Sequence, residues 1–327
     1  MTISIRAFIT RGALVAAFVS AGSGAAAQTR AASGALPAGV AVRDVHFFSE
    51  HVQCHARLFL PQGFNERSQA PGVVLAPGWG ETAASIEGYA ARFASRGIVS
   101  MAIDYRGWGK SGGFLYLVED VRFDDRLRFS QHTAKVRIAR KRLVPRHQIL
   151  DIRNAIAYLQ GEPGVDRARI GVWGTDMAGG HMMQVAATDA RITAAVAQVP
   201  VIAGRDAPRQ AWAPTGQLHQ DVIRRARSGE GVSDDVETRL ALAEYHPFWS
   251  VDEIPESTAV LFVIAGRDGE VDNEAHAVAA SKRLKGPTRV VTVPGATHDQ
   301  IGRGPAFETS ANAAVEWFLE HLVVAGR

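Results

Sequence analysis

The sequence has almost no cysteine. Its 327 residues contain a single one, Cys54, so no disulfide can form within the chain. Cys54 lies in a stretch of alternating apolar and polar residues, 52–60, and this alternation predicts a strand. We therefore expect Cys54 to be a buried structural thiol and not a nucleophile.

An excess of charge of one sign is also lacking. Lys and Arg number 36 against 33 Asp and Glu, which gives a formal net charge of +3. The charge is about +1 without Arg6 and Arg11, which belong to the leader described below, so we expect no nucleic-acid partner. One basic run, residues 135–142, is interleaved with apolar residues, which favours a solvated helix face, a lid or a packing segment.

The apolar run near the N-terminus is too short to span a bilayer. Residues 1–27 combine a basic start, a short apolar core and the small residues 25–27, a pattern typical of a secretory signal peptide. We expect cleavage near Ala27, export to the periplasm or the medium, and no membrane anchor. The following residues, 28–41, are rich in Ala, Gly and Ser and predict a flexible tail.

Motifs for metals and cofactors are missing as well. The eleven histidines show no spacing typical of a metal site. A glycine pair, Gly107 and Gly109, follows a predicted strand, but the third glycine and the acidic partner of a dinucleotide site do not follow. We therefore expect a small-molecule substrate with neither metal nor cofactor, and the pattern carries no signal for the oligomeric state.

Apolar strands and amphipathic helices alternate along residues 42–327. This alternation predicts an α/β fold in one domain, with a mostly parallel central sheet and helices on both faces. A hairpin at residues 42–60 is expected at the edge of the sheet. Two segments interrupt the alternation, at about 114–146 and 200–250, and we expect them to form a cap.

Three loops at the predicted carboxyl ends of strands carry the chemistry. The first is a tight turn between an apolar strand and a helix, with small residues around Asp176, which is the context of a nucleophile elbow. The second contains Asp268 and the third contains His298. Ligands of open α/β sheets gather at this edge, and the order nucleophile, acid, histidine is that of a catalytic triad.

From about residue 42 onward the chain resembles the α/β-hydrolase superfamily. The elbow, the Gly-x-Asp-x-x-Val pattern at 266–271 and the Gly-Ala-x-His pattern at 295–298 carry the resemblance. The stretches 104–111 and 161–171 are most similar to the branch of dienelactone hydrolases and prolyl-peptidase relatives such as X-Pro dipeptidyl-peptidases. The resemblance implies the α/β-hydrolase fold and a hydrolase activity.

The chain departs from that branch at the nucleophile, because Asp176 stands where Ser or Cys is usual. An aspartate at the elbow is the pattern of epoxide hydrolases and haloalkane dehalogenases. Such a carboxylate attacks a saturated carbon to form an ester, and His298, oriented by Asp268, then activates the water that hydrolyses it. The backbone N–H groups of Trp79 and Met177 are the expected oxyanion hole.

The resemblance favours an epoxide over a haloalkane, because dehalogenases commonly place a Trp directly after the nucleophile, where this chain has Met177. Epoxide opening needs an acid, and Tyr245 and Tyr116 in the two insertions are the candidates. Other functions stay open. They are an ester, lactone or peptide hydrolase relative whose Ser is replaced, a non-covalent lyase-type role of Asp176, and a binding protein that keeps the pocket.

Overall fold

The computed structural model describes residues 36–122, 124, 126–202 and 244–323, with isolated residues between 220 and 242. The predicted signal peptide, most of the predicted tail and most of the second insertion lie outside this part of the chain. Within it, no helix is both long and apolar enough to cross a membrane.

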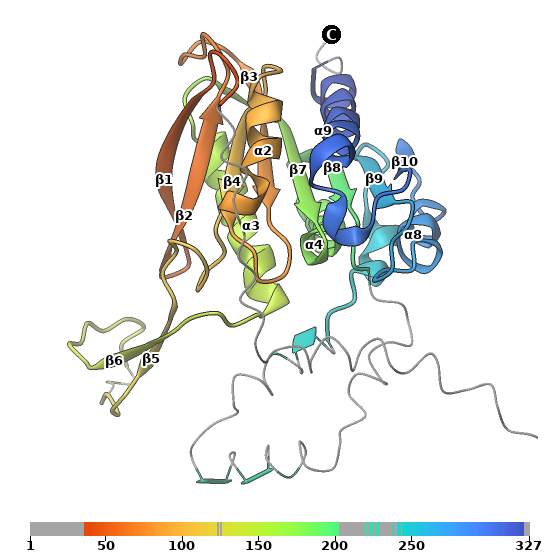
Figure 1. Cartoon of the computed structure of the whole chain (residues 1–327). Helices are drawn as coiled ribbons and strands as arrows, with labels where there is room; N and C mark the ends of the chain where they lie inside the picture. Colours follow the sequence, from red (N-terminus) through yellow and green to blue (C-terminus); the bar gives the residue numbers. More distant parts are fainter. Residues whose placement is uncertain are drawn as a thin grey trace, which may run out of the picture.

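An eight-stranded sheet forms the centre of the molecule (Figure 1). Its strand order is β1-β2-β4-β3-β7-β8-β9-β10; β1 and β2 form an antiparallel edge hairpin, β2 pairs antiparallel with β4, and all later neighbours are parallel. The predicted α/β fold with a mostly parallel sheet is therefore confirmed. The strands of this sheet are β1 (Ala41–Ser49), β2 (Val52–Leu60), β3 (Ala70–Ala76), β4 (Val99–Ile103), β7 (Val165–Thr175), β8 (Ile192–Gln198), β9 (Ala259–Ala265) and β10 (Thr288–Val293).

Helices cover both faces of the sheet. One apolar cluster packs α2 and α9 against one face, and a second packs α3, α4 and α8 against the other. The central strands β3, β4 and β9 are almost wholly buried, as continuous apolar runs in a doubly covered parallel sheet should be. The α-helices are α2 (Ala83–Ala94), α3 (Pro145–Gln160), α4 (Met177–Thr188), α8 (Ala279–Ser281) and α9 (Gly304–Phe318).

In the described part of the chain, four short helical segments of other types join these elements. The 3₁₀ segments are η1 (Pro247–Glu253) and η3 (His298–Gln300), and the π segments are η2 (Glu274–Val278) and η4 (Leu319–Val323). η2 and α8 follow each other directly, so residues 274–281 form one continuous helical segment. Cys54 is fully buried in β2, and burial raises the pKa of its thiol to about 12, which agrees with a structural role.

The first insertion contains a separate two-stranded antiparallel ribbon, β5 (Phe114–Leu117) and β6 (Val136–Ala139). It extends away from the central sheet (Figure 1). The basic run at 135–142 thus includes a strand and does not form a helix face. Its apolar and charged residues alternate with the period of two that a strand requires.

Candidate active site

The turn from β7 into α4 places Asp176 at the carboxyl edge of the sheet. Its backbone has φ +54° and ψ −124°, a strained conformation for a residue with a side chain. Small neighbours permit the turn, since a β-carbon on Gly174 would lie 2.5 Å from the Ala178 carbonyl oxygen. A backbone hydrogen bond stabilises this strained conformation: the Asp176 N–H donates to the Gln198 carbonyl at 3.0 Å. This is the geometry of a nucleophile elbow.

The loops after β9 and β10 bring Asp268 and His298 to the same edge. The two loops are joined by backbone bonds from Gly266 to Val293, 2.9 Å, and from Arg267 to Ala296, 2.8 Å. His298 Nδ1 lies 3.0 Å from Asp268 Oδ2, and the Asp268 side chain is completely buried. The Glu270 and Val271 N–H groups donate to Asp268 Oδ1 at 2.9 Å each, which fixes the carboxylate toward the imidazole.

The two carboxylate oxygens of Asp176 face different partners. Oδ1 lies 3.6 Å from His298 Nε2, and Oδ2 accepts the backbone N–H of Trp79 at 2.9 Å. Trp79 belongs to the loop 77–82, between β3 and α2. The structure therefore brings Asp176, Asp268, His298 and the Trp79 N–H together as the sequence predicts. Met177, the first residue of α4, follows Asp176 directly; its role as second oxyanion donor stays a prediction.

The charge state of His298 depends on two opposing effects. Burial lowers the pKa of His298, but the neighbouring carboxylates of Asp176 and Asp268 raise it by more, so that it moves from 6.5 to about 9. At neutral pH the resting site thus contains an imidazolium between two carboxylates.

This shift predicts a loss of stability at alkaline pH. Because the folded pKa exceeds the unfolded one, the contribution of His298 is complete below pH 6.5 and is lost as pH rises through about 9. It amounts to roughly 3 kcal/mol. Urea unfolding across this range is expected to show the loss in the native chain and a smaller loss in Asp176→Asn, which lacks one charge. An equal loss in both proteins would contradict the assignment.

Two further carboxyl groups lie beside the elbow. A β-carbon on Gly78 would lie 3.0 Å from Asp176 Oδ2 and 3.3 Å from Glu81 Oε2, so both side chains approach the same backbone position. Burial is the main reason that the pKa of Glu81 is raised, and also that of Glu270. In the described part of the chain no group of three or more His, Cys, Asp or Glu residues is arranged to hold a metal ion.

The two tyrosines predicted as acids lie in different surroundings. The Tyr245 hydroxyl is 2.7 Å from His181 Nδ1 and 3.2 Å from the Met177 carbonyl, and both rings are buried behind the elbow. Burial raises the pKa of Tyr245 well above 10, so its hydroxyl keeps its proton. Tyr116 lies in the β5–β6 ribbon, with Arg137 and Arg142 over its ring. The role of either tyrosine as an acid stays a prediction.

Tyr245 has a buried partner that the sequence does not predict. His181 lies on α4 with its Nε2 3.0 Å from the Gln148 side-chain oxygen, and burial lowers the pKa of His181 to about 3. A neutral imidazole thus links α3, α4 and the segment around Tyr245 behind the elbow. A lone histidine on an apolar helix predicts packing, and nothing in the local pattern indicates these long-range contacts.

Fold and site together define an α/β-hydrolase: an elbow after a central strand, an acid and a histidine after the last two strands, and a backbone donor after β3. Comparison with known proteins supports this class. The family model described as acetyl xylan esterase (AXE1) matches residues 36–209, and that of the prolyl oligopeptidase family matches residues 130–324. The chain belongs to the α/β-hydrolase superfamily of hydrolytic enzymes, which both family models represent.

Individual relatives are more distant. An Escherichia coli protein described as an uncharacterized 31.7 kDa protein in the traX-finO intergenic region is 26% identical over 269 residues, covering 72% of this chain and 85% of the relative. The quorum-quenching protein AidA of Acinetobacter baumannii is 30% identical over 162 residues, covering 49% of this chain and 44% of that protein.

Solved structures share the fold at low sequence identity. The hypothetical protein PA2218 from Pseudomonas aeruginosa superposes with a TM-score of 0.68 at 21% identity, covering 88% of this chain and 95% of that one. Acetyl xylan esterase from Paenibacillus sp. R4 superposes with a TM-score of 0.57 at 19% identity, covering 87% and 85%. These similarities establish the architecture. The reaction has to be inferred from the residues of the site.

Proposed function

We propose that this protein is a hydrolase in which the Asp176 carboxylate attacks a saturated electrophilic carbon, and that this carbon belongs to an epoxide in preference to a haloalkane. The observation that carries the proposal is the separation of the two Asp176 oxygens. Oδ2 is held by the Trp79 N–H at 2.9 Å, while Oδ1 faces His298 at 3.6 Å. One oxygen is thus bound as an ester carbonyl would be, and the other is the nucleophile.

In the first step Oδ1 forms a bond to the epoxide carbon, and the carbon–oxygen bond of the ring breaks. The electron pair moves to the ring oxygen, which becomes an alkoxide and takes a proton. We assign this proton to His298, whose pKa of about 9 makes it an imidazolium at neutral pH. Tyr245 is the less favoured donor, because its hydroxyl is already bound to His181 and the Met177 carbonyl.

In the second step the ester on Asp176 is hydrolysed. His298 is neutral at this point because it gave its proton to the ring oxygen in the first step. Esterification also removes the negative charge of Asp176, which had raised the pKa of His298, so the neutral imidazole can act as a base. His298 takes a proton from water, and the hydroxide adds to the Asp176 carbonyl carbon. The oxyanion forms on Oδ2, already beside the Trp79 N–H. When the intermediate collapses, the Oδ1–carbonyl carbon bond breaks and its electron pair stays on Oδ1. The His298 imidazolium returns its proton to Oδ1, and the diol leaves with that oxygen.

Isotope labelling tests this route. The full chain is incubated with a panel of aliphatic and aryl epoxides in heavy-oxygen water, and both the diol and the peptide that contains Asp176 are weighed. In a single turnover the label is expected in Asp176 and not in the diol, because the diol carries the original Oδ1. A labelled diol beside an unlabelled Asp176 would show direct attack by water and overturn the proposal.

A second candidate is a relative of the ester and peptide hydrolases whose serine has been replaced. The matches to acetyl xylan esterase and prolyl oligopeptidase models favour it. With a carboxylate as nucleophile an ordinary ester would give an anhydride, so this candidate predicts little esterase activity in the native chain.

Replacing Asp176 by Ser distinguishes the two candidates. If the scaffold is a disabled serine hydrolase, Asp176→Ser should gain hydrolysis of p-nitrophenyl acetate by about 100-fold, because His298 and Asp268 would activate the hydroxyl. Asp176→Ala is the control, since it opens the same space without a nucleophile. Equal rates in the Ser and Ala variants would count against the second candidate.

A further inference from the structure

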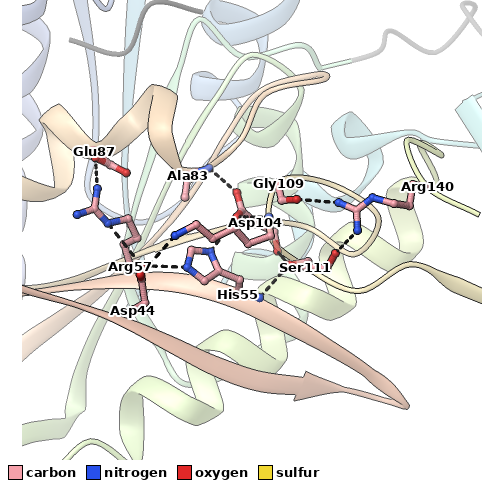
Figure 2. A network of polar contacts seen from close by, with 10 residues as sticks. Asp44, His55, Arg57, Ala83, Glu87, Asp104, Gly109, Ser111 and Arg140 are labelled. Carbon is pink, nitrogen blue, oxygen red and sulfur yellow. Dashed lines mark hydrogen bonds and ion pairs between the residues drawn. The ribbon is translucent and has the colours of Figure 1, made fainter. Parts of the chain in front are cut away.

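A buried polar network joins β2, the turn after β4 and the start of α2 (Figure 2). Asp104 follows β4 directly and His55 lies in β2, and their side chains are 4% and 3% exposed. His55 Nδ1 is 2.8 Å from Asp104 Oδ2, and its Nε2 is 3.0 Å from Asp44 Oδ1. The reaction proposed above uses none of these groups. Burying them is costly unless each is paired, so their arrangement needs a reason.

Asp104 provides the N-terminal cap of α2 from outside the helix. The N-cap residue Thr82 makes no side-chain capping bond, and the first turn of α2 contains no acidic residue. Instead the Ala83 N–H donates to Asp104 Oδ1 at 2.8 Å. A helix start requires acceptors for its free N–H groups and is stabilised by negative charge. Asp104 satisfies both requirements.

The capped residue is adjacent to the loop that holds the oxyanion donor. The loop 77–82 runs from the buried strand β3 to Ala83, and within it the Trp79 N–H binds Asp176 Oδ2. One end of the loop is thus fixed by the sheet and the other by Asp104. If the start of α2 shifts, Trp79 must shift with it, because only a short segment separates the two.

The orientation of Asp104 is itself fixed on several sides. Its Oδ2 accepts the Lys110 N–H at 3.0 Å, in addition to contacting His55. Gly109 has φ +50°, and a β-carbon there would lie 2.3 Å from the Asp104 carboxylate. Only glycine therefore permits this close packing of the turn on Asp104.

We propose that Asp104, oriented by His55, is a positioning residue that holds the loop 77–82 so that the Trp79 N–H meets the Asp176 carboxylate. Asp104 touches no substrate and acts through Ala83 and Trp79. Its effect on the rate rests on the proposed function, but its effect on the loop does not.

Two variants disturb Asp104 in different ways, and each has a matched control. Asp104→Asn removes the charge and presents an NH₂ group where acceptors are needed; Asp189→Asn alters another largely buried aspartate, which pairs with Arg191 and does not contact the loop. Gly109→Ala adds a methyl group that displaces the Asp104 carboxylate without changing its charge. Gly63→Ala introduces a side chain at φ +73° in open space and so imposes backbone strain alone.

Hydrogen exchange of the full chain, followed by mass spectrometry of the peptide containing residues 77–83, tests the proposal without any substrate. We expect about tenfold faster exchange there in Asp104→Asn and Gly109→Ala, with no change in Asp189→Asn and Gly63→Ala. Unchanged exchange in the two Asp104-directed variants, or equal acceleration in the controls, would overturn it.

The rate of epoxide hydrolysis is measured separately. The substrate is an epoxide whose turnover in heavy-oxygen water puts label into Asp176. Asp104→Asn is expected to lower kcat about tenfold with KM nearly unchanged, because the donor is needed most when the oxyanion forms. If no epoxide leads to label in Asp176 of the native chain, the proposed function fails. The hydrogen-exchange measurement then still decides whether Asp104 positions the loop. Native-like kcat together with faster exchange would show that the loop position does not matter for catalysis and would overturn that part.

Discussion

Replacing His298 by Gln is expected to trap the enzyme as an ester on Asp176. The glutamine keeps much of the size of the side chain but cannot take a proton from water, so the first step can proceed while the second cannot. Steady-state turnover should fall by a factor on the order of 10³–10⁴. The intact mass of the protein should rise by the mass of one epoxide molecule, and fragmentation should place the addition on Asp176.

The control for this experiment is the double variant Asp176→Asn with His298→Gln. It has no carboxylate at the elbow and should gain no mass, which excludes alkylation of surface carboxylates as the source of the signal. If His298 also delivers the first proton, as its pKa of about 9 implies, the ester should form more slowly than in the native chain. An adduct on another residue, or no adduct with an epoxide that the native chain hydrolyses, would contradict the covalent route.

The second large effect concerns stability and not chemistry. Arg106→Ala is expected to lower the free energy of unfolding by about 3–5 kcal/mol, because it leaves the carboxylate of Asp151 buried and uncompensated. The Asp151 side chain is fully buried, and its Oδ1 accepts from Arg106 Nε at 2.8 Å. The same guanidinium donates to Glu50 at 2.8 Å and Ser49 at 2.7 Å, so it joins β1, α3 and the turn after β4.

Urea unfolding measures this difference against two comparisons. Arg126→Ala removes an exposed pair with Asp124, which water and salt screen, and should leave the free energy of unfolding unchanged. The double variant Arg106→Met with Asp151→Leu removes both charges and should recover most of the loss. A loss below about 1 kcal/mol in Arg106→Ala would mean that water reaches Asp151 and compensates its charge.

Much of the site follows from local sequence patterns. The elbow can be predicted from the sequence because a tight turn between a strand and a helix requires small residues beside Asp176. The positions of Asp268 and His298 can be predicted because each residue follows an apolar run that ends in a turn. Parallel strands bring their carboxyl ends to one edge, so three loops distant in sequence converge there. The structure places these residues together, with His298 Nδ1 3.0 Å from Asp268.

The ribbon β5–β6 shows where such patterns fail. Its charged and apolar residues suit either a helix face or a strand over so short a stretch, and pairing with a partner segment decides between them. Val136 pairs with Leu117 and Ile138 with Leu115, a register that no local signal specifies.

The sequence by itself determined the fold class, the elbow and the order of the candidate triad, because strand periodicity and turn chemistry are properties of neighbouring residues. Only the tertiary structure decided how side chains from different elements meet. It set Asp176 Oδ2 on the Trp79 N–H and Oδ1 toward His298, placed Tyr245 on His181 behind the elbow, and made Asp104 the cap of α2. These contacts depend on strand register and crossover geometry, which the whole chain fixes.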